Sequence, residues 1–120
     1  MARERVPRLQ ISAEGDVTVV ALTERRILDE VGISEIGEQL GSMAIQSPKP
    51  KFILDFASVA HMSSSALGML ITLHKRIRER NGELRLCNIQ PAILEVFHIT
   101  RLSEIFNICS SRQEALDSMK

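Results

Sequence analysis

The chain has 120 residues, of which 44% are hydrophobic and 3% aromatic, and its 15 basic and 15 acidic side chains give a formal net charge of zero. This length fits one domain with an aliphatic core, which we expect over residues 1–120 with a mobile arm at residues 1–7. The balanced charge and the scarcity of aromatic rings argue against nucleic acids and membrane surfaces as partners, and they favour proteins.

Cys87 and Cys109 lie in strand-like segments, and neither has a His or Cys companion at the spacing of a metal site. We therefore expect buried free thiols in a reducing compartment, with no metal and no cofactor. The N-terminus lacks the apolar stretch of a signal peptide, and no apolar run is long enough to span a bilayer. These features predict a cytoplasmic protein without membrane insertion.

A β-hairpin is predicted at the start of the chain, with strands at 9–12 and 17–22 around a turn at 14–16. The second strand is β-branched and long, so we expect it inside the sheet. Asp29 is placed to cap a helix that carries an apolar face formed by Ile33, Ile36, Leu40 and Met43. Three glycines weaken this helix by roughly 1 kcal/mol each relative to Ala: Gly32, Gly37 and Gly41.

The middle of the chain predicts a buried strand followed by a long helix. A break at 47–50 precedes a strand at 52–56 that is apolar on both faces, as expected at the centre of a sheet covered by helices. Three consecutive serines, Ser63 to Ser65, then stand at the helix entrance. The helix has an apolar stripe at three-and-four spacing, made of Leu67, Leu70, Ile71, His74 and Ile77. Asn81-Gly82 provides its stop.

The last third predicts a strand at 83–87, a short helix that begins at Pro91, and a strand at 105–109. Ser111 and Glu114 have the spacing of a capping box, which indicates a terminal helix. The resulting order is ββαβαβαβα. Strands that alternate with helices require crossovers over a sheet, so we expect an α/β fold with a mixed sheet of about five strands and about four helices.

The three serines have a structural and a functional interpretation. One hydroxyl is enough to cap the helix, a role worth roughly 1 kcal/mol. Three hydroxyls exceed this need, and the first turn of a helix stabilises an attached anion through its free N–H groups and its dipole. A phosphorylatable serine would fit this position.

The segments Ile53–Phe56, His61-Met62 and Ser63–Gly68, with Asn81–Leu84 and Pro91, resemble the STAS domain of bacterial anti-sigma-factor antagonists. In that family, the first serine of an Asp-Ser-Ser-Gly-Leu-Gly motif is the phosphorylation site. Matched by position, this serine is Ser64, and Ser65, Leu67 and Gly68 also match. The chain departs from the motif at Ser63, which replaces Asp, and at Ala66, which replaces Gly. Ser63 and Ser65 are the substitute acceptors.

The resemblance implies partner switching. The unmodified antagonist binds an anti-sigma factor that is also a serine kinase, phosphorylation of the serine ends this binding, and a serine phosphatase resets the cycle. We expect the contact surface to surround the serines, with Ile89 at its rim and Met69 in the core. Its predicted members are Asp29, His61, Met62, Ser63, Ser65 and Ala66. The alternative is a STAS-like scaffold in a larger signalling or transport-associated assembly without phosphorylation, which the departures at Ser63 and Ala66 favour.

An enzyme is the remaining class of function. Ser64 with His74 or His98 and Asp55 supplies the residue types of a hydrolase triad. However, His74 lies more than two helical turns beyond Ser64, and the chain has neither a Gly-x-Ser-x-Gly elbow nor a glycine-rich phosphate loop. We therefore expect no catalytic activity. The basic run at 74–80 is interrupted by Glu79 and is interpreted as a solvated helix face.

Overall fold

The computed structural model describes residues 9–119 and is built around a five-stranded sheet. In spatial order, the strands are β1 (Leu9–Glu14), β2 (Val17–Leu22), β4 (Lys51–Asp55), β6 (Glu83–Cys87) and β7 (Asn107–Cys109). β1 and β2 are antiparallel, and every other neighbouring pair is parallel. The predicted mixed sheet is confirmed, with β2 internal and β4 at the centre.

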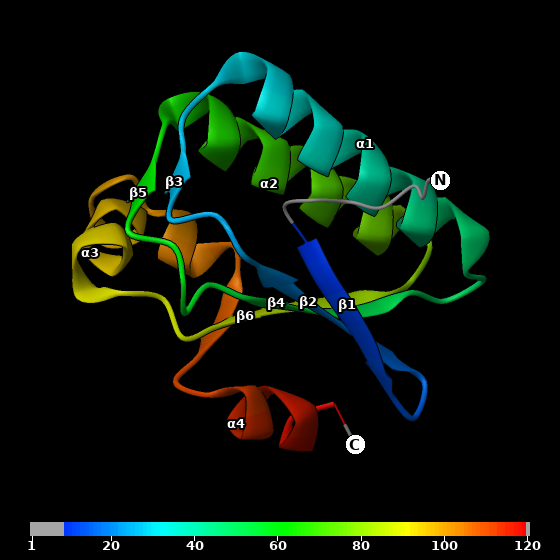
Figure 1. Cartoon of the computed structure of the whole chain (residues 1–120). Coiled ribbons are helices and arrows are strands. Elements are labelled where there is room, and N and C mark those ends of the chain that lie inside the picture. The colour runs from blue at the N-terminus through cyan, green and yellow to red at the C-terminus, as the bar shows by residue number, and fades with distance from the viewer. Residues whose placement is uncertain (1–8, 120) are drawn as a thin grey trace.

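Within residues 9–119, four α-helices surround the sheet, in agreement with the predicted number. α1 (Glu30–Gln46) and α2 (Ser64–Glu79) lie side by side on one face, and the short α4 (Arg112–Asp117) lies on the opposite face (Figure 1). α3 (Pro91–Ile99) lies beyond one end of the sheet (Figure 1). The predicted mobile arm at residues 1–7 falls outside the described residues. No helix within residues 9–119 combines the length and the apolar character that a membrane span requires.

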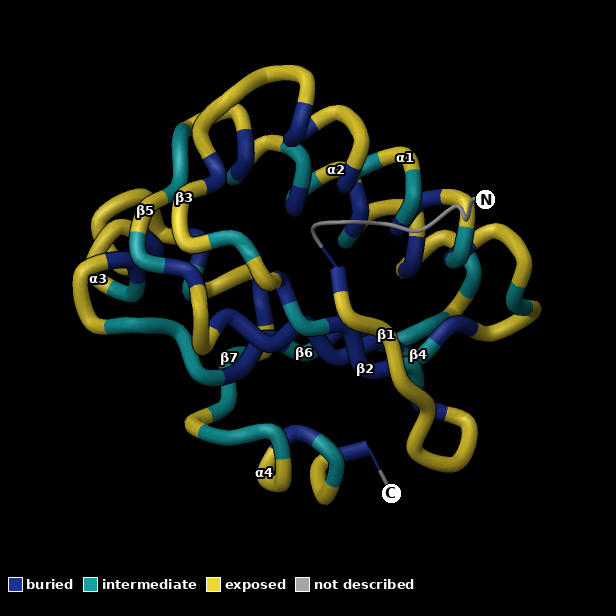
Figure 2. The backbone as a smooth tube through the Cα atoms, in the orientation of Figure 1, coloured by how far each residue is buried: buried dark blue, intermediate teal, exposed yellow. Residues whose placement is uncertain are grey.

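Burial follows from the alternation of side chains along the strands. Leu54 faces the large core under α1 and α2, whereas its neighbour Ile53 faces a smaller core beneath α4, and both are fully buried. The smaller core combines residues of three strands with two from the end of the chain: Val17, Val19, Ile53, Cys87, Ala115 and Met119. Figure 2 shows this burial along the central strands, while the outer sides of the helices are exposed.

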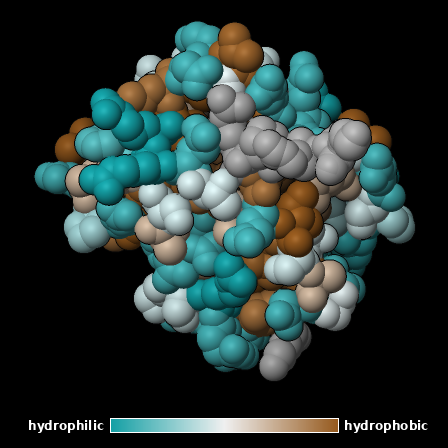
Figure 3. Space-filling model, in the orientation of Figure 1, coloured by the Kyte–Doolittle hydropathy of each residue, from teal (hydrophilic) through white to brown (hydrophobic). Residues whose placement is uncertain are grey.

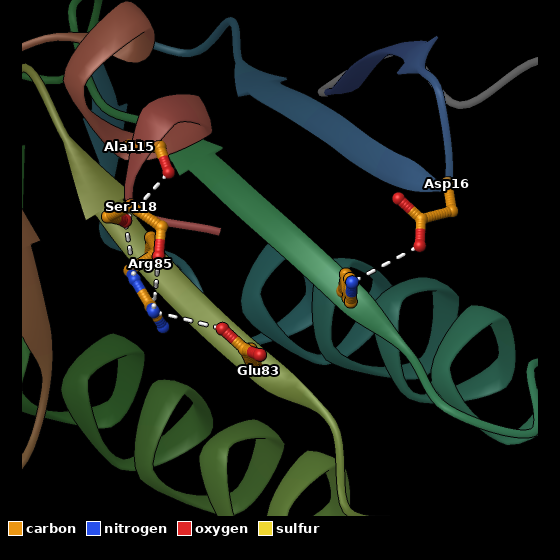
Figure 4. A network of polar contacts seen from close by, with 6 residues as sticks. Asp16, Glu83, Arg85, Ala115 and Ser118 are labelled. Carbon is orange, nitrogen blue, oxygen red and sulfur yellow. Dashed lines mark hydrogen bonds and ion pairs between the residues drawn. The ribbon is translucent and has the colours of Figure 1, made fainter. Parts of the chain in front are cut away.

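Polar contacts fix α4 to its face of the sheet. Arg85 of β6 donates through Nε to Ser118 Oγ at 2.9 Å and through Nη2 to Glu83 Oε1 at 2.9 Å (Figure 4). Arg112 donates through Nε and Nη2 to Asp55 Oδ2, at 3.2 and 2.9 Å. A helix of six residues is marginal by itself, so these contacts and the small core beneath it hold it in place.

Two predictions about the helices, the buried stripe of α2 and the capping box of α4, are corrected in detail. The most buried row of α2 is formed by Ala66, Leu70, Leu73 and Ile77. The predicted stripe members Leu67, Ile71 and His74 flank this row and are half-buried. At α4, Ser111 caps the helix by accepting the N–H of Glu114, as predicted. The Glu114 carboxylate does not accept the N–H of Ser111, as a capping box requires. It accepts the N–H and the hydroxyl of Ser110 instead.

The last strand is shorter than predicted, because Ile105 and Phe106 belong to a turn. A 3₁₀ helix, η1 (Leu102–Glu104), precedes β7, and the N–H groups of Ile105 and Phe106 both donate to the carbonyl of Leu102. These donors are therefore not available to the sheet. The strand keeps Cys109, which is half-buried rather than buried since β7 is an edge strand. Cys87 is buried as predicted, and both thiols are free.

Candidate functional site

Two short strands that the sequence analysis did not predict hold the entrances of α1 and α2 together. β3 (Arg26–Ile27) pairs in parallel with β5 (His61–Met62) as a separate two-stranded sheet. The pairing extends to the residue before α2, because the N–H of Ser63 donates to the carbonyl of Ile27 at 3.1 Å. Each short strand leads within two residues into a helix, so the N-termini of α1 and α2 lie at the same end of the molecule (Figure 1).

The three serines have three different environments. Ser63 is the N-cap of α2, and its Oγ accepts the N–H of Ala66 at 3.2 Å. Ser65 is exposed, and its Oγ donates to Glu30 Oε2 of α1 at 3.1 Å. Ser64 is the first residue of the helix and is exposed, and its side chain has no hydrogen bond to any residue in the described range 9–119. Among the three serines, Ser64 is therefore the one whose side chain is exposed and has no hydrogen bond within residues 9–119.

Asp29 is the N-cap of α1, as predicted. Its Oδ2 accepts the N–H of Gly32 at 2.9 Å, and its carbonyl accepts the N–H of Ile33 at 3.0 Å. The side chain is exposed and faces the same end of the molecule as the serines, since α1 and α2 begin there. The cap explains why an acidic residue stands here, and a contact with a partner stays a prediction.

The other predicted contact residues differ in exposure. His61 is exposed, and Met62 is half-buried and packs against the large core. Ala66 is fully buried, so its methyl group packs inside the protein and we leave it out of the proposed contact surface. Met69 and Ile89 are half-buried and also pack against the core.

Glu30 is a neighbour of the serine cluster that the sequence analysis missed. It is the acidic residue in the first turn of α1, whereas the first turn of α2 contains no acidic side chain. Through its hydrogen bond with Ser65, the Glu30 carboxylate reaches the first turn of the neighbouring helix. Its place beside the Asp29 cap was visible in the sequence, but its distance of 35 residues from Ser65 concealed the contact.

A shallow groove of about 590 Å³ runs between the outer sides of α1 and α2 and includes Glu30 and Ser65. Small residues from both helices shape it, among them Gly37, Gly41 and Gly68. Next to the entrance of α1, the apolar side chains of Leu28 and Val31 remain 43% and 67% exposed. Figure 3 shows that one face of the molecule carries hydrophobic side chains in separate groups among hydrophilic ones.

The residue types of a hydrolase triad are not brought together. Asp55 accepts hydrogen bonds from the N–H of Ala57, from Asn88 and from Arg112. Burial alone would raise the pKa of this carboxyl group, but these hydrogen bonds and the Arg112 charge outweigh it and lower the pKa. The Nδ1 atom of His98 forms a hydrogen bond with Ser103 Oγ. The ring of His74 packs edge-on against that of Phe106, with the two ring centroids 5.2 Å apart. No hydrogen bond within residues 9–119 joins any of the three to Ser64.

Neither cysteine offers an activated nucleophile. Burial, assisted by the Asp55 charge, raises the pKa of Cys87 to about 12, and burial with the Glu114 charge raises that of Cys109. A thiol with a raised pKa is protonated and weakly reactive at neutral pH. Residues 9–119 also contain no group of three His, Cys, Asp or Glu side chains that could hold a metal ion.

The comparison with known families gives one match over most of the chain: the family model of the STAS domain matches residues 2–115. The anti-sigma factor antagonist BtrV of Bordetella bronchiseptica, described as putative, is 33% identical over 70 residues, which are 58% of this chain and 60% of that protein. The anti-sigma-B factor antagonist of Bacillus subtilis is 26% identical over 100 residues, 83% of this chain and 87% of that protein. The chain spans between about half and three fifths of the length of the first curated relatives it matches.

Solved structures match the fold over most of the chain. An anti-sigma-factor antagonist (STAS) domain protein from Planctomyces limnophilus has a TM-score of 0.81 and 27% identity, covering 92% of this chain and 97% of that one. The anti-sigma factor antagonist SpoIIAA matches in its unphosphorylated form with a TM-score of 0.71 and 19% identity, over 92% and 96% of the two chains. SpoIIAA of Bacillus in its phosphorylated form matches with a TM-score of 0.72 and 18% identity, covering 93% of this chain and 99% of that one.

Proposed function

Because this chain belongs to the STAS domain family, we propose that it is an anti-sigma-factor antagonist that is switched by phosphorylation of Ser64. The unmodified protein binds an anti-sigma factor with serine-kinase activity, and this binding frees a sigma factor. The kinase then phosphorylates Ser64, the complex separates, and a serine phosphatase restores the binding form. We assign no catalytic activity to the chain itself, and we place the cycle in the cytoplasm, where its two free thiols stay reduced.

The observation that carries this proposal is that the three serines differ in their hydrogen bonds. Ser63 is engaged as the helix cap and Ser65 is engaged by Glu30, while the exposed Ser64 hydroxyl has no partner in the described part of the chain. A kinase needs an accessible hydroxyl whose modification does not unfold the protein. Ser64 is exposed and its side chain makes no hydrogen bond within residues 9–119, which supports Ser64 as the acceptor over Ser63 and Ser65.

The helix entrance is suited to the modified state as well. In the transfer, the bond between Ser64 Oγ and the γ-phosphorus of ATP forms, the bond to the leaving oxygen of ADP breaks, and the hydroxyl proton passes to a base of the kinase. The phosphate adds a charge of about −1.5 to −2 and three acceptor oxygens, which the first N–H groups of α2 can bind. The similar TM-scores of the two SpoIIAA forms indicate that a fold of this type can tolerate the phosphate.

The proposed contact surface consists of exposed groups around Ser64. Asp29 and His61 contribute polar groups, and Leu28 and Val31 contribute apolar surface. A phosphate in the middle of such a surface must lose much of its water when the partner binds, and it repels nearby partner carboxylates. Phosphorylation can therefore end the binding without a change of fold.

A binding experiment with purified variants tests the switch. Wild type, Ser64→Ala, Ser64→Glu and the control Ser42→Glu are used as bait in a lysate of the native host, and the captured anti-sigma factor is then purified for titration. Ser42 is an exposed serine of α1 that also lines the groove, so its variant adds the same charge away from the serine cluster. We expect Ser64→Glu to weaken the affinity at least tenfold, and Ser64→Ala and Ser42→Glu to retain it.

The competing function is that of a scaffold without phosphorylation, which the departure at Ser63 favours. That position holds a cap in this structure and supplies no negative charge next to the acceptor. A scaffold predicts that Ser64→Glu binds its partner as tightly as Ser64→Ala does. Equal affinities of these two variants would therefore replace the switch by the scaffold.

A further inference from the structure

A side-chain hydrogen bond links the first turns of α1 and α2. The Oγ of Ser65, the second residue of α2, donates to Oε2 of Glu30, the first residue of α1, at 3.1 Å. Below this bond, the two helices continue side by side along the groove that both residues line (Figure 1). The contact therefore lies where the two helix entrances meet.

Glu30 complements the charge of both helix entrances. An acidic side chain in the first turn stabilises a helix, because it faces the positive end of the macrodipole. Glu30 has this position in α1, and through Ser65 it also reaches the first turn of α2, which has no acidic residue of its own. The first turn of the helix that contains Ser64 thus contacts a carboxylate supplied by its neighbour.

We infer that Glu30 is a positioning residue that transmits phosphorylation of Ser64 to the entrance of α1; this inference rests on the proposed function. A phosphate on Ser64 is adjacent in sequence to Ser65, and it brings about −1.5 to −2 charge to the turn that the Glu30 carboxylate already contacts. The phosphate oxygens compete for the same positive helix end, and their charge repels the carboxylate. Glu30 consequently leaves Ser65, and the side-chain link between the helix entrances opens.

The consequence falls on the surface that α1 presents to a partner. The first turn of α1 carries the exposed Val31, and Leu28 lies just before its cap. When Glu30 loses its anchor on α2, this turn is retained mainly by the Asp29 cap and its own helical hydrogen bonds. A partner then encounters two differences in the phosphorylated protein, a new charge on α2 and a loosened turn on α1.

Amide hydrogen exchange measured by NMR tests this relay without the partner or the kinase. The full chain is prepared with serine or with genetically encoded phosphoserine at position 64, in wild-type, Glu30→Gln and Glu38→Gln backgrounds. Gln at position 30 can still accept the Ser65 hydroxyl but has no charge to be repelled. Glu38 is exposed on the same groove two turns further along α1, so its variant controls for the lost charge.

We expect phosphoserine to accelerate exchange of the Gly32 and Ile33 amides at least threefold in wild type and Glu38→Gln, and less than 1.5-fold in Glu30→Gln. No acceleration in wild type, or equal acceleration in Glu30→Gln, would overturn the relay. The hydrogen-exchange result does not depend on whether phosphorylation of Ser64 ends partner binding. If phosphoserine 64 or Ser64→Glu abolishes partner binding while exchange is unchanged, the relay is wrong and the proposed function stands. If binding survives, the proposed function is wrong.

Discussion

Asp55 is the one buried charged residue among the described positions, at 7% exposure, and its carboxylate ties three segments together. It accepts from Ala57, Asn88 and Arg112, so it joins the end of β4 to the loop after β6 and to α4. A buried carboxylate with these partners stabilises the fold when it is charged, whereas an unpaired one would destabilise it. Its state should therefore control the docking of α4.

We predict that Asp55→Asn lowers the free energy of unfolding by about 2 kcal/mol at pH 7, the range for hydrogen bonds to charged groups. The folded-state pKa lies below 3.8, so the contribution is complete above the unfolded-state pKa and is lost as the pH falls through the folded-state pKa. Urea unfolding at pH 7 and at successively lower pH measures the difference. The difference in the free energy of unfolding between wild type and Asp55→Asn should decrease as the pH falls.

The control is Asp16→Asn, which removes the ion pair of the exposed Asp16 with the half-buried Lys51 at 3.2 Å (Figure 4). A surface pair of this kind is worth less than about 1 kcal/mol. Equal effects of the two variants, or a cost of Asp55→Asn that does not change with pH, would show that the buried pair does not hold α4.

The serine cluster gives a second prediction at the scale of single residues. Ser63→Ala removes the helix cap and should cost about 1 kcal/mol of stability. Ser64→Ala should change stability by less than about 0.5 kcal/mol, because the exposed hydroxyl has no partner within residues 9–119. Thermal and urea unfolding of the two variants measure this contrast. A comparable loss in Ser64→Ala would mean that its hydroxyl supports the fold and is not free for modification.

At the scale of elements, the contact between α1 and α2 distinguishes two of the glycines that weaken α1 as an isolated helix. A Cβ at Gly37 would lie 2.9 Å from Met69 Cγ of α2, closer than real Cβ contacts. A Cβ at Gly41 would lie 3.9 Å from Arg76 Cδ, an ordinary contact distance. A side chain at position 37 would therefore force Met69 or α2 to shift, whereas one at position 41 would not.

We predict opposite effects for two alanine substitutions in α1. Gly37→Ala should destabilise the protein by about 1 kcal/mol or more, since α2 must shift or Met69 must change its conformation. Gly41→Ala should stabilise it by up to about 1 kcal/mol through helix propensity. Urea unfolding tests both. The double variant Gly37→Ala with Met69→Ala should lose less than the sum of its two single variants, and strict additivity would contradict the proposed clash.

The elements also show which parts of the structure the sequence could predict. Periodicity and caps located the hairpin, the central strand and all four helices, because each of these signals is local. The strands β3 and β5 were not predicted, because two-residue strands show no periodicity. They are defined by pairing between segments 35 residues apart in sequence. The contact of Glu30 was not predicted either, because its partner Ser65 belongs to the other helix. The serines were located by sequence, but only the contacts distinguish Ser64 from its neighbours.

At the scale of the whole molecule, the proposed functional end is formed by the entrances of α1 and α2 on one face of the sheet, and α4 lies on the other face (Figure 1). The formal net charge is zero, so a phosphate changes the molecule through its local surroundings rather than by altering a large overall field. A rigid sheet with two cores suits such a switch, because the modification can change the surface while the scaffold stays the same.

The most direct test of this account is phosphosite mapping by mass spectrometry on the protein purified from its native host, with Ser64→Ala in parallel. The account predicts a phosphate on Ser64 that disappears in the variant and does not move to Ser63 or Ser65. The absence of phosphate from all three serines across growth conditions, or a phosphate on Ser63 or Ser65 with Ser64 unmodified, would contradict it.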